Sequence, residues 1–144
     1  MTSGDVKDVQ PRLTTHVHQV RVDSTINQMP DLVFHLTRLT GSMMIWVGTV
    51  STEENQSSTS VCLTKDWSCA VPPFSSFSAI STQLSSNSPA NTFSHSLSQK
   101  LAQRFKIQIF LSIDISPELL ELEHSMRIQL EKELFIIVKS LESK

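Results

Sequence analysis

The stretch DLVFHLTRLTGSMMIWVGTV, residues 31–50, decides the fold of this chain. Residues 31–39 alternate apolar and polar side chains, which predicts a β-strand. The TGS corner at residues 40–42 is so short that the next run must return antiparallel to the first, as a hairpin. That run, residues 43–50, is apolar on both faces, so we expect it to be covered twice, once by a helix or second sheet. Trp46 is expected to anchor the core, and direct contact with a partner is the alternative.

Length and composition indicate one globular domain. The 144 residues are 39% hydrophobic and 18% charged, as in packed proteins, and a chain of this length buries roughly two thirds of its unfolded surface. The formal net charge of −2 gives no broad attraction to nucleic acid or anionic lipid. No apolar run approaches the ~20 residues of a membrane span, and the first residues do not resemble a signal peptide. We therefore predict a protein of the cytoplasm or nucleus without nucleic-acid or membrane partners.

Three further runs predict strands. Residues 16–22 alternate apolar and polar side chains and are typical of an edge strand. Residues 60–64 predict a short strand. Residues 107–113 are almost continuously apolar, as in a central strand that is buried on both faces.

The remaining segments set the expected domain organisation. Residues 1–12 are polar and lack periodicity, which predicts a mobile N-terminal arm before a single α+β domain at residues 13–143. Serine and proline dominate the stretch at about 65–91, and we expect a long, mobile connection there. Residues 76–84 within this connection are a candidate for an additional strand.

Two helices complete the prediction. Apolar residues recur at every fourth position over residues 93–105, which indicates an amphipathic helix. A longer helix is expected to begin after Ser116, a good N-cap, with Pro117 in the first position, and to end near Leu141. The fold class is therefore α+β, with a mostly antiparallel sheet or sandwich of about six strands and two helices, the C-terminal one long.

The apolar arc of the C-terminal helix exceeds the ~100° stripe that packing on one sheet requires. One stripe faces the sheet, and a second stripe consists of Leu120, Ile128, Phe135 and Val138. Two neighbours are possible for this second stripe, namely another chain or the helix at residues 93–105. We take the second stripe as the candidate partner-binding surface.

The residues that carry chemistry give no catalytic pattern. Three glycines in the whole chain cannot form a phosphate-binding loop, and no G-x-S-x-G elbow occurs. Cys62 and Cys69 are predicted to be free thiols. His16 and His18 share one strand face, but no other spacing matches a zinc pattern, so exposed strand histidines are the favoured interpretation. We predict no catalytic residue, no cofactor, no metal and no enzymatic activity; a metal hydrolase using these two histidines is the enzyme alternative.

Several segments together resemble the proteasome assembly chaperone 4 family. An H-x-x-R-L-T-x-S corner leads into an apolar strand that ends in W-V-G; the residues are His35, Arg38, Leu39, Thr40, Ser42, Trp46, Val47 and Gly48. A helix of the L-A-Q-R type, residues 101–104, then enters an apolar strand, and a final helix follows at residues 119–134. These segments cover about half of the chain.

The resemblance implies a small α+β fold and a non-catalytic role. That role is pairing with proteasome assembly chaperone 3 and binding α-type subunits while the α-ring of the 20S core particle forms. An assembly chaperone needs apolar patches rather than reactive groups, because it leaves when a mature neighbour takes the same surface. The alternative is a small trafficking or signalling scaffold, since fold alone does not determine the partners of a protein.

Overall fold

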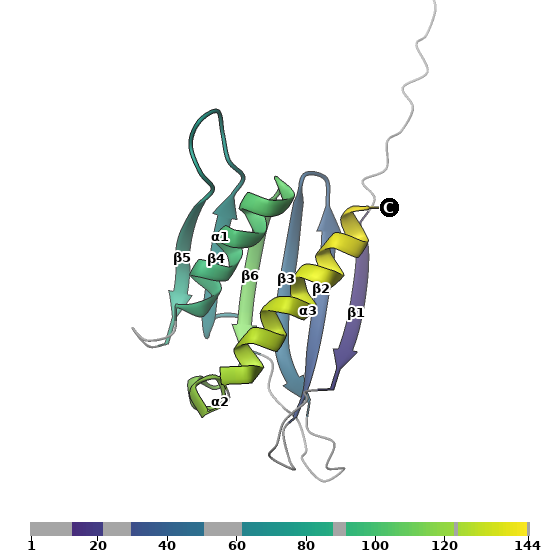
Figure 1. Cartoon of the computed structure of the whole chain (residues 1–144), viewed down its shortest axis with the longest axis vertical. Helices are drawn as coiled ribbons and strands as arrows, with labels where there is room; N and C mark the ends of the chain where they lie inside the picture. Colours follow the sequence, from purple (N-terminus) through teal and green to yellow (C-terminus); the bar gives the residue numbers. More distant parts are fainter. Residues whose placement is uncertain (1–12, 22–29, 51–61, 88–91, 123, 144) are drawn as a thin grey trace, which may run out of the picture.

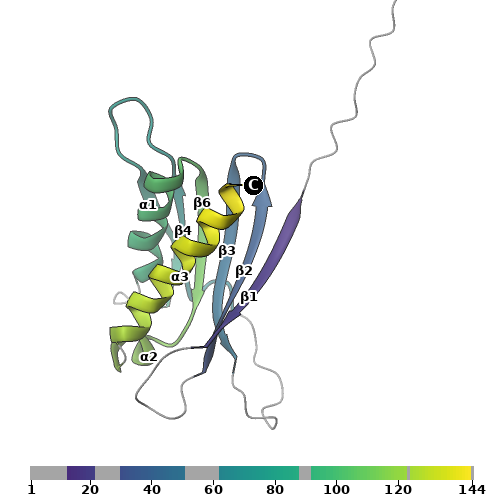
Figure 2. The same ribbon diagram turned by 45° about the vertical axis from the view of Figure 1, so that its right-hand side comes forward.

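The computed structural model describes residues 13–21, 30–50, 62–87, 92–122 and 124–143. They form one six-stranded sheet in the order β1-β2-β3-β6-β4-β5, with helices packed on one of its faces (Figures 1 and 2). The elements are β1 (Thr14–Val20), β2 (Asp31–Leu39), β3 (Ser42–Val50), β4 (Asp66–Val71), β5 (Ile80–Ser86), α1 (Phe93–Phe105), β6 (Gln108–Asp114), α2 (Pro117–Leu122) and α3 (His124–Glu142). The predicted α+β class with about six strands and a long C-terminal helix is confirmed.

The β2–β3 hairpin has the predicted register. Leu39 pairs with Ser42, so that two residues form the turn. Gly41 has a φ of 74° at this turn, a backbone conformation that side chains disfavour. β1 pairs antiparallel with β2 and forms one edge of the sheet, as predicted for the first strand.

β6 occupies the centre of the sheet, between β3 and β4. It pairs antiparallel with β4 but parallel with β3, which makes the sheet mixed. A parallel pair cannot be closed by a tight turn and needs a crossover connection. The crossover contains β4, β5 and α1, and α1 lies across one face of the sheet (Figure 1).

The prediction of a long connection at residues 65–91 is wrong over much of its length, because β4 and β5 form a hairpin there. The candidate strand at residues 76–84 corresponds to β5. Residues 62–64 of the predicted strand at 60–64 are not in a strand, and β4 begins at Asp66. The apolar alternation that would have predicted these strands is missing, because serine takes inward positions: the hydroxyl of Ser81 forms a hydrogen bond with the hydroxyl of Ser98 in α1 at 2.8 Å. Small hydroxyl groups satisfy one another where apolar side chains were expected.

The helices follow the sequence signals closely at their ends. α1 has the predicted bounds and is capped by Lys106, whose φ is 60° and whose backbone N–H donates to the carbonyl of Ala102 at 3.0 Å. Ser116 acts as the predicted cap, since its hydroxyl accepts from the backbone N–H of Leu119 at 3.4 Å. The single predicted C-terminal helix is divided into α2 and α3, and Glu123 between them lies outside the described residues.

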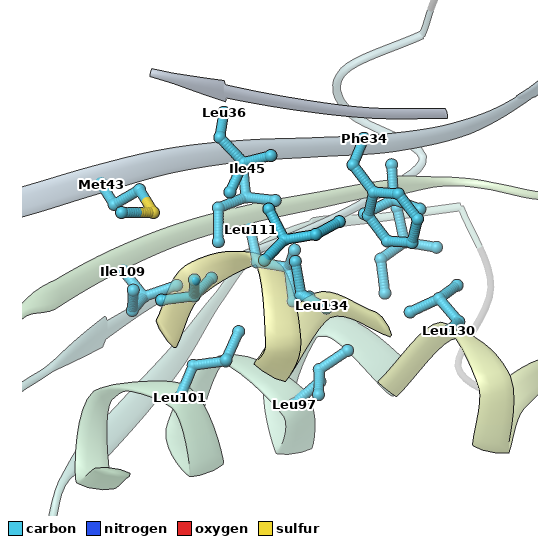
Figure 3. Packing of buried hydrophobic residues seen from close by; sticks show 14 of the residues in the cluster. Phe34, Leu36, Met43, Ile45, Leu97, Leu101, Ile109, Leu111, Leu130 and Leu134 are labelled. Atoms are coloured by element: carbon cyan, nitrogen blue, oxygen red, sulfur yellow. The ribbon is translucent and has the colours of Figure 1, made fainter. Parts of the chain in front are cut away.

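The main core lies between the sheet and the helices α1 and α3 (Figure 3). Inward-facing side chains of β2, β3 and β6 meet leucines of both helices and are fully buried. The labelled members of this core are Phe34, Leu36, Met43, Ile45, Leu97, Leu101, Ile109, Leu111, Leu130 and Leu134. Burial of a side chain of this size stabilises a protein by about 1.5–3 kcal/mol.

A buried carboxylate fixes the start of α1 to the sheet. Asp66 of β4 is fully buried and accepts hydrogen bonds from the backbone N–H of Ser94 at 2.9 Å and from its hydroxyl at 2.6 Å. Gln83 of β5 donates to the same carboxylate at 2.9 Å. Thr92, at the N-cap position, makes no capping bond through its side chain. Asp66 therefore caps the helix from a neighbouring element, near the positive end of the helix dipole.

We predict that Asp66→Ala lowers the free energy of unfolding by about 2–4 kcal/mol, because it leaves the buried backbone N–H of Ser94 without an acceptor and removes one hydrogen bond each from the Ser94 hydroxyl and from Gln83. Urea denaturation followed by far-UV circular dichroism measures this loss. Thr92→Ala is the matched control and should change stability by less than about 0.5 kcal/mol, since that side chain makes no capping bond. Equal effects of the two variants would contradict the role given to Asp66.

Candidate functional site

The four residues of the predicted partner-binding stripe do not form one exposed surface. Leu120 and Val138 are buried inside the chain itself, so they are not available to a partner. Phe135 is half-buried against the core, and only Ile128 is largely exposed, at 56%. Partner contact at Ile128 and Phe135 stays a prediction.

The helix α1 is the neighbour that the second stripe required. The rings of Phe105 in α1 and Phe135 in α3 lie 5.8 Å apart between centroids. Lys100 of α1 pairs with Glu131 of α3 at 2.8 Å, and Arg127 of α3 lies over the Phe93 ring at 4.5 Å. Of the two alternatives that the sequence left open, the structure shows the internal one.

Trp46 is not in the main core, contrary to the expectation from the sequence. Side chains alternate along β3, and Met43, Ile45 and Val47 take the inward positions under the helices. Trp46 and the half-exposed Met44 therefore point to the opposite face of the sheet. β3 is therefore apolar on both faces: the described helices bury one face and leave the other uncovered.

The side of the sheet opposite the helices, which we call the open face, extends across all six strands. Residues 62–65 cover part of it at the end of β6, where the hydroxyl of the buried Ser112 donates to the Leu63 carbonyl at 2.7 Å. Strand pairing identifies its members, because residues directly opposite each other share a face: Met44 pairs with Phe110, and Phe110 pairs with Cys69. The outward apolar residues of the open face include Val17, Val33, Leu39, Met44, Trp46, Val50, Phe110, Trp67, Val71 and Ile80. Both tryptophans of the chain are among them.

The distribution of charge distinguishes the open face from the rest of the surface. The outward positions of the described strands include no lysine, arginine or glutamate, although the chain has 12 Lys and Arg and 14 Asp and Glu residues. The carboxylates Asp31 and Asp114 lie at one end, where Gln19 and Lys65 bind them. Aromatic side chains without charged neighbours are typical of the core of a protein interface. Outward alternation without charge was the signal in the sequence that would have revealed Trp67 and Phe110.

Trp46 shapes the middle of the open face. Its indole ring lies over Gly48, where a Cβ atom would overlap the ring. Gly48 is consequently buried although it faces outward. Among the described residues nothing accepts a hydrogen bond from the Trp46 indole N–H. The partly buried ring therefore packs flat on Gly48 and takes no part in a polar network of the described residues.

The other candidate sites offer little chemistry. His16 and His18 pair with inward residues of β2 and so face the helix side of the sheet, away from the open face. No group of three potential metal ligands occurs in the part of the chain that the structure describes. Both cysteines are free thiols, as predicted, and the Thr64 hydroxyl holds the pKa of the Cys62 thiol below its usual value.

A surface hollow of about 440 Å³ lies beside the β2–β3 turn, between Arg38 and Glu142. These two side chains form an ion pair at 3.5 Å, and the Arg38 guanidinium also donates to the Leu141 carbonyl at 2.7 Å. The arginine of the corner motif thus holds the end of α3 against the hairpin. None of the described helices has both the length and the apolar character that crossing a membrane requires.

The fold has a counterpart among solved structures. A chain of the "Crystal Structure of a Novel Chaperone Complex for Yeast 20S Proteasome Assembly" superposes on this chain with a TM-score of 0.62 and 15% sequence identity. The match covers 89% of this chain and 96% of that chain. At this identity the likeness concerns the fold, which is that of the proteasome assembly chaperones.

Sequence comparison gives the family. The model described as "Proteasome assembly chaperone 4" matches residues 31–115, more than half of the chain and the region from β2 to the residue after β6. The chain therefore belongs to the proteasome assembly chaperone 4 family, as the corner motif and the helix at residues 101–104 indicated. No curated protein matches the chain at a significant level.

We predict that Gly48→Ala displaces the Trp46 indole, because the new methyl group takes the place of the ring. Near-UV circular dichroism of a Trp67→Phe background, in which Trp46 is the one remaining tryptophan, should change clearly. The free energy of unfolding should fall by about 1–3 kcal/mol, the usual range for overpacking. Val50→Ala adds no atoms near the ring and should leave the spectrum unchanged; an unaltered Gly48→Ala spectrum would contradict the stacking of Trp46 on Gly48.

Proposed function

We propose that this chain is a non-catalytic assembly chaperone for the 20S proteasome core particle. It pairs with proteasome assembly chaperone 3 and binds α-type subunits during formation of the α-ring, in the cytoplasm and nucleus. Membership of the proteasome assembly chaperone 4 family supports the proteasome assignment. The pairing, the α-type subunits and the compartment are parts of the proposal.

The open face is the observation that carries the proposal. Apolar side chains extend over this six-stranded face and its carboxylates lie at one end only; such a surface is unfavourable in water and is typical of one that another protein covers. Sheets bury such faces against a second sheet, about 10 Å away, with the strands nearly aligned. A partner chaperone with a sheet of its own fits this surface.

The described residues are suited to binding rather than to catalysis. Family and fold are consistent with a protein that is not an enzyme. A chaperone of assembly acts through differential affinity for intermediates and products, which needs complementary surfaces and no activated nucleophile. The half-exposed aromatic and aliphatic groups of the open face provide such a surface.

Native copurification tests the proposal as a whole. We expect the tagged protein to recover proteasome assembly chaperone 3 together with α-type subunits and little mature proteasome, identified by mass spectrometry. Recovery of trafficking or signalling proteins in their place would refute the proposal and favour the scaffold alternative. Bound metal in the purified protein would support the enzyme alternative.

We predict that Met44→Asp abolishes pairing while Ile128→Asp leaves it intact. Both side chains are about half exposed, at 45% and 56%, so neither substitution should unfold the protein. Only Met44 lies on the open face, where an unpaired carboxylate would be buried on pairing, at a penalty of several kcal/mol. Analytical ultracentrifugation with purified proteasome assembly chaperone 3 measures the effect. Loss of pairing with Ile128→Asp alone would instead support the helix stripe that the sequence suggested.

A further inference from the structure

The loop between β4 and β5 projects beyond the end of the sheet (Figures 1 and 2). We call residues 72–78 the hairpin tip. Its two aromatic residues, Phe74 and Phe77, are 81% and 69% exposed, which makes them the most exposed large apolar side chains of the described residues. Neither contributes to the main core, so their exposure needs another explanation.

The hairpin tip has a defined conformation. The backbone N–H of Phe77 donates to the carbonyl of Phe74 at 2.9 Å, and Ser75 between them has a φ of 56°. Pro72 and Pro73 restrict the backbone on one side of this turn. The two phenylalanines are therefore held close together in a tight turn, which lowers the entropy lost when a partner binds them.

The base of the tip is fixed to α1. Gln103 accepts a hydrogen bond from the backbone N–H of Ala79 at 2.7 Å, and Gln99 donates to the carbonyl of the same residue at 2.9 Å. Ala79 itself is buried. Both polar groups of this residue are thus satisfied by one helix, so the tip is supported by the body of the domain.

The chemistry of the tip favours a protein partner. No Asp, Glu, Lys or Arg occurs from Trp67 to Gln99, a stretch that contains the hairpin except its first residue, Asp66. Binding to anionic lipid generally combines apolar side chains with basic residues, and the hairpin tip itself has none. Exposed aromatic side chains that fill apolar pockets are instead the usual centres of protein interfaces.

The position of the tip indicates which protein. Val71 and Ile80 pair with each other at its base, and both belong to the open face. The apolar surface therefore continues without a charged residue from the middle of the sheet to Phe74 and Phe77. A partner that covers the open face reaches the tip along this continuous surface.

We infer that the hairpin tip is a second anchor for the chaperone that pairs with the open face, with Phe74 and Phe77 inserted into an apolar hollow of that partner. The inference rests on the proposed function and adds a contact outside the sheet. An α-type subunit is the competing occupant. If an α-type subunit binds the tip instead, a change in the tip should leave pairing with the chaperone normal and abolish binding of the subunit.

The test uses the full chain with Phe74→Ala and Phe77→Ala together. The control replaces Ile136 of α3 by alanine, an exposed apolar side chain outside both the open face and the predicted partner stripe. Isothermal titration with purified proteasome assembly chaperone 3 should give a Kd at least about tenfold higher for the tip variant and unchanged for the control. Thermal unfolding of both variants should match that of the wild type, because neither change touches the core.

Three outcomes would overturn the inference. Wild-type pairing by the tip variant would refute it, including the case in which capture of an α-type subunit is lost instead. An equal loss of affinity in the control would show a general effect of apolar area. Failure of the wild-type chain to pair at all would refute the proposed function as well, so the two failures are distinguishable.

Discussion

The parallel pairing of β3 with β6 at the centre of the sheet is the constraint on which the rest of the structure depends. Two parallel neighbours require a crossover, and α1 provides it on one face of the sheet. α3 then packs beside α1 on the same face, through Phe105 and Phe135 and through the ion pair of Lys100 with Glu131. Because both long helices share this face, the opposite face has no described helix to cover it. The open face is thus a direct consequence of the topology.

Side-chain chemistry is divided between the two faces in a way that matches this topology. Ion pairs lie on the helix side, as with Lys100 and Glu131, or at the ends of the sheet, as with Lys65 and Asp114. The middle of the open face has no ion pair among the described residues; Trp46 lies there, packed on Gly48. Charged helix surfaces keep the chain soluble, while a charge-free sheet face can be desolvated without leaving an unpaired ion.

Periodicity predicted most of the fold but little of the site. The bounds of β2 and α1 follow from apolar spacing, because each has one polar and one apolar side. The β4–β5 hairpin was missed, since Ser68 and Ser81 occupy inward positions and bond serines of α1. Two of the four residues of the predicted partner stripe, Leu120 and Val138, are buried inside the chain, because no sequence pattern tells whether a second apolar stripe meets another chain or another helix. Trp46 was assigned to the core because both faces of its strand are apolar, and the sequence then does not show which face the helices cover.

The absence of charge on the open face also limits how a partner can be selected. Complementary charges usually discriminate one partner from another, and here neither attraction nor repulsion is available in the middle of the face. Shape is what remains for selection in the middle of the face, and the hairpin tip with the exposed Phe74 and Phe77 is its main projection. In a symmetric pair of identical chains each projection would need a matching hollow on the same surface. A related but different chain can supply hollows where this one has projections, which is the geometry that the proposed pairing with a second chaperone requires.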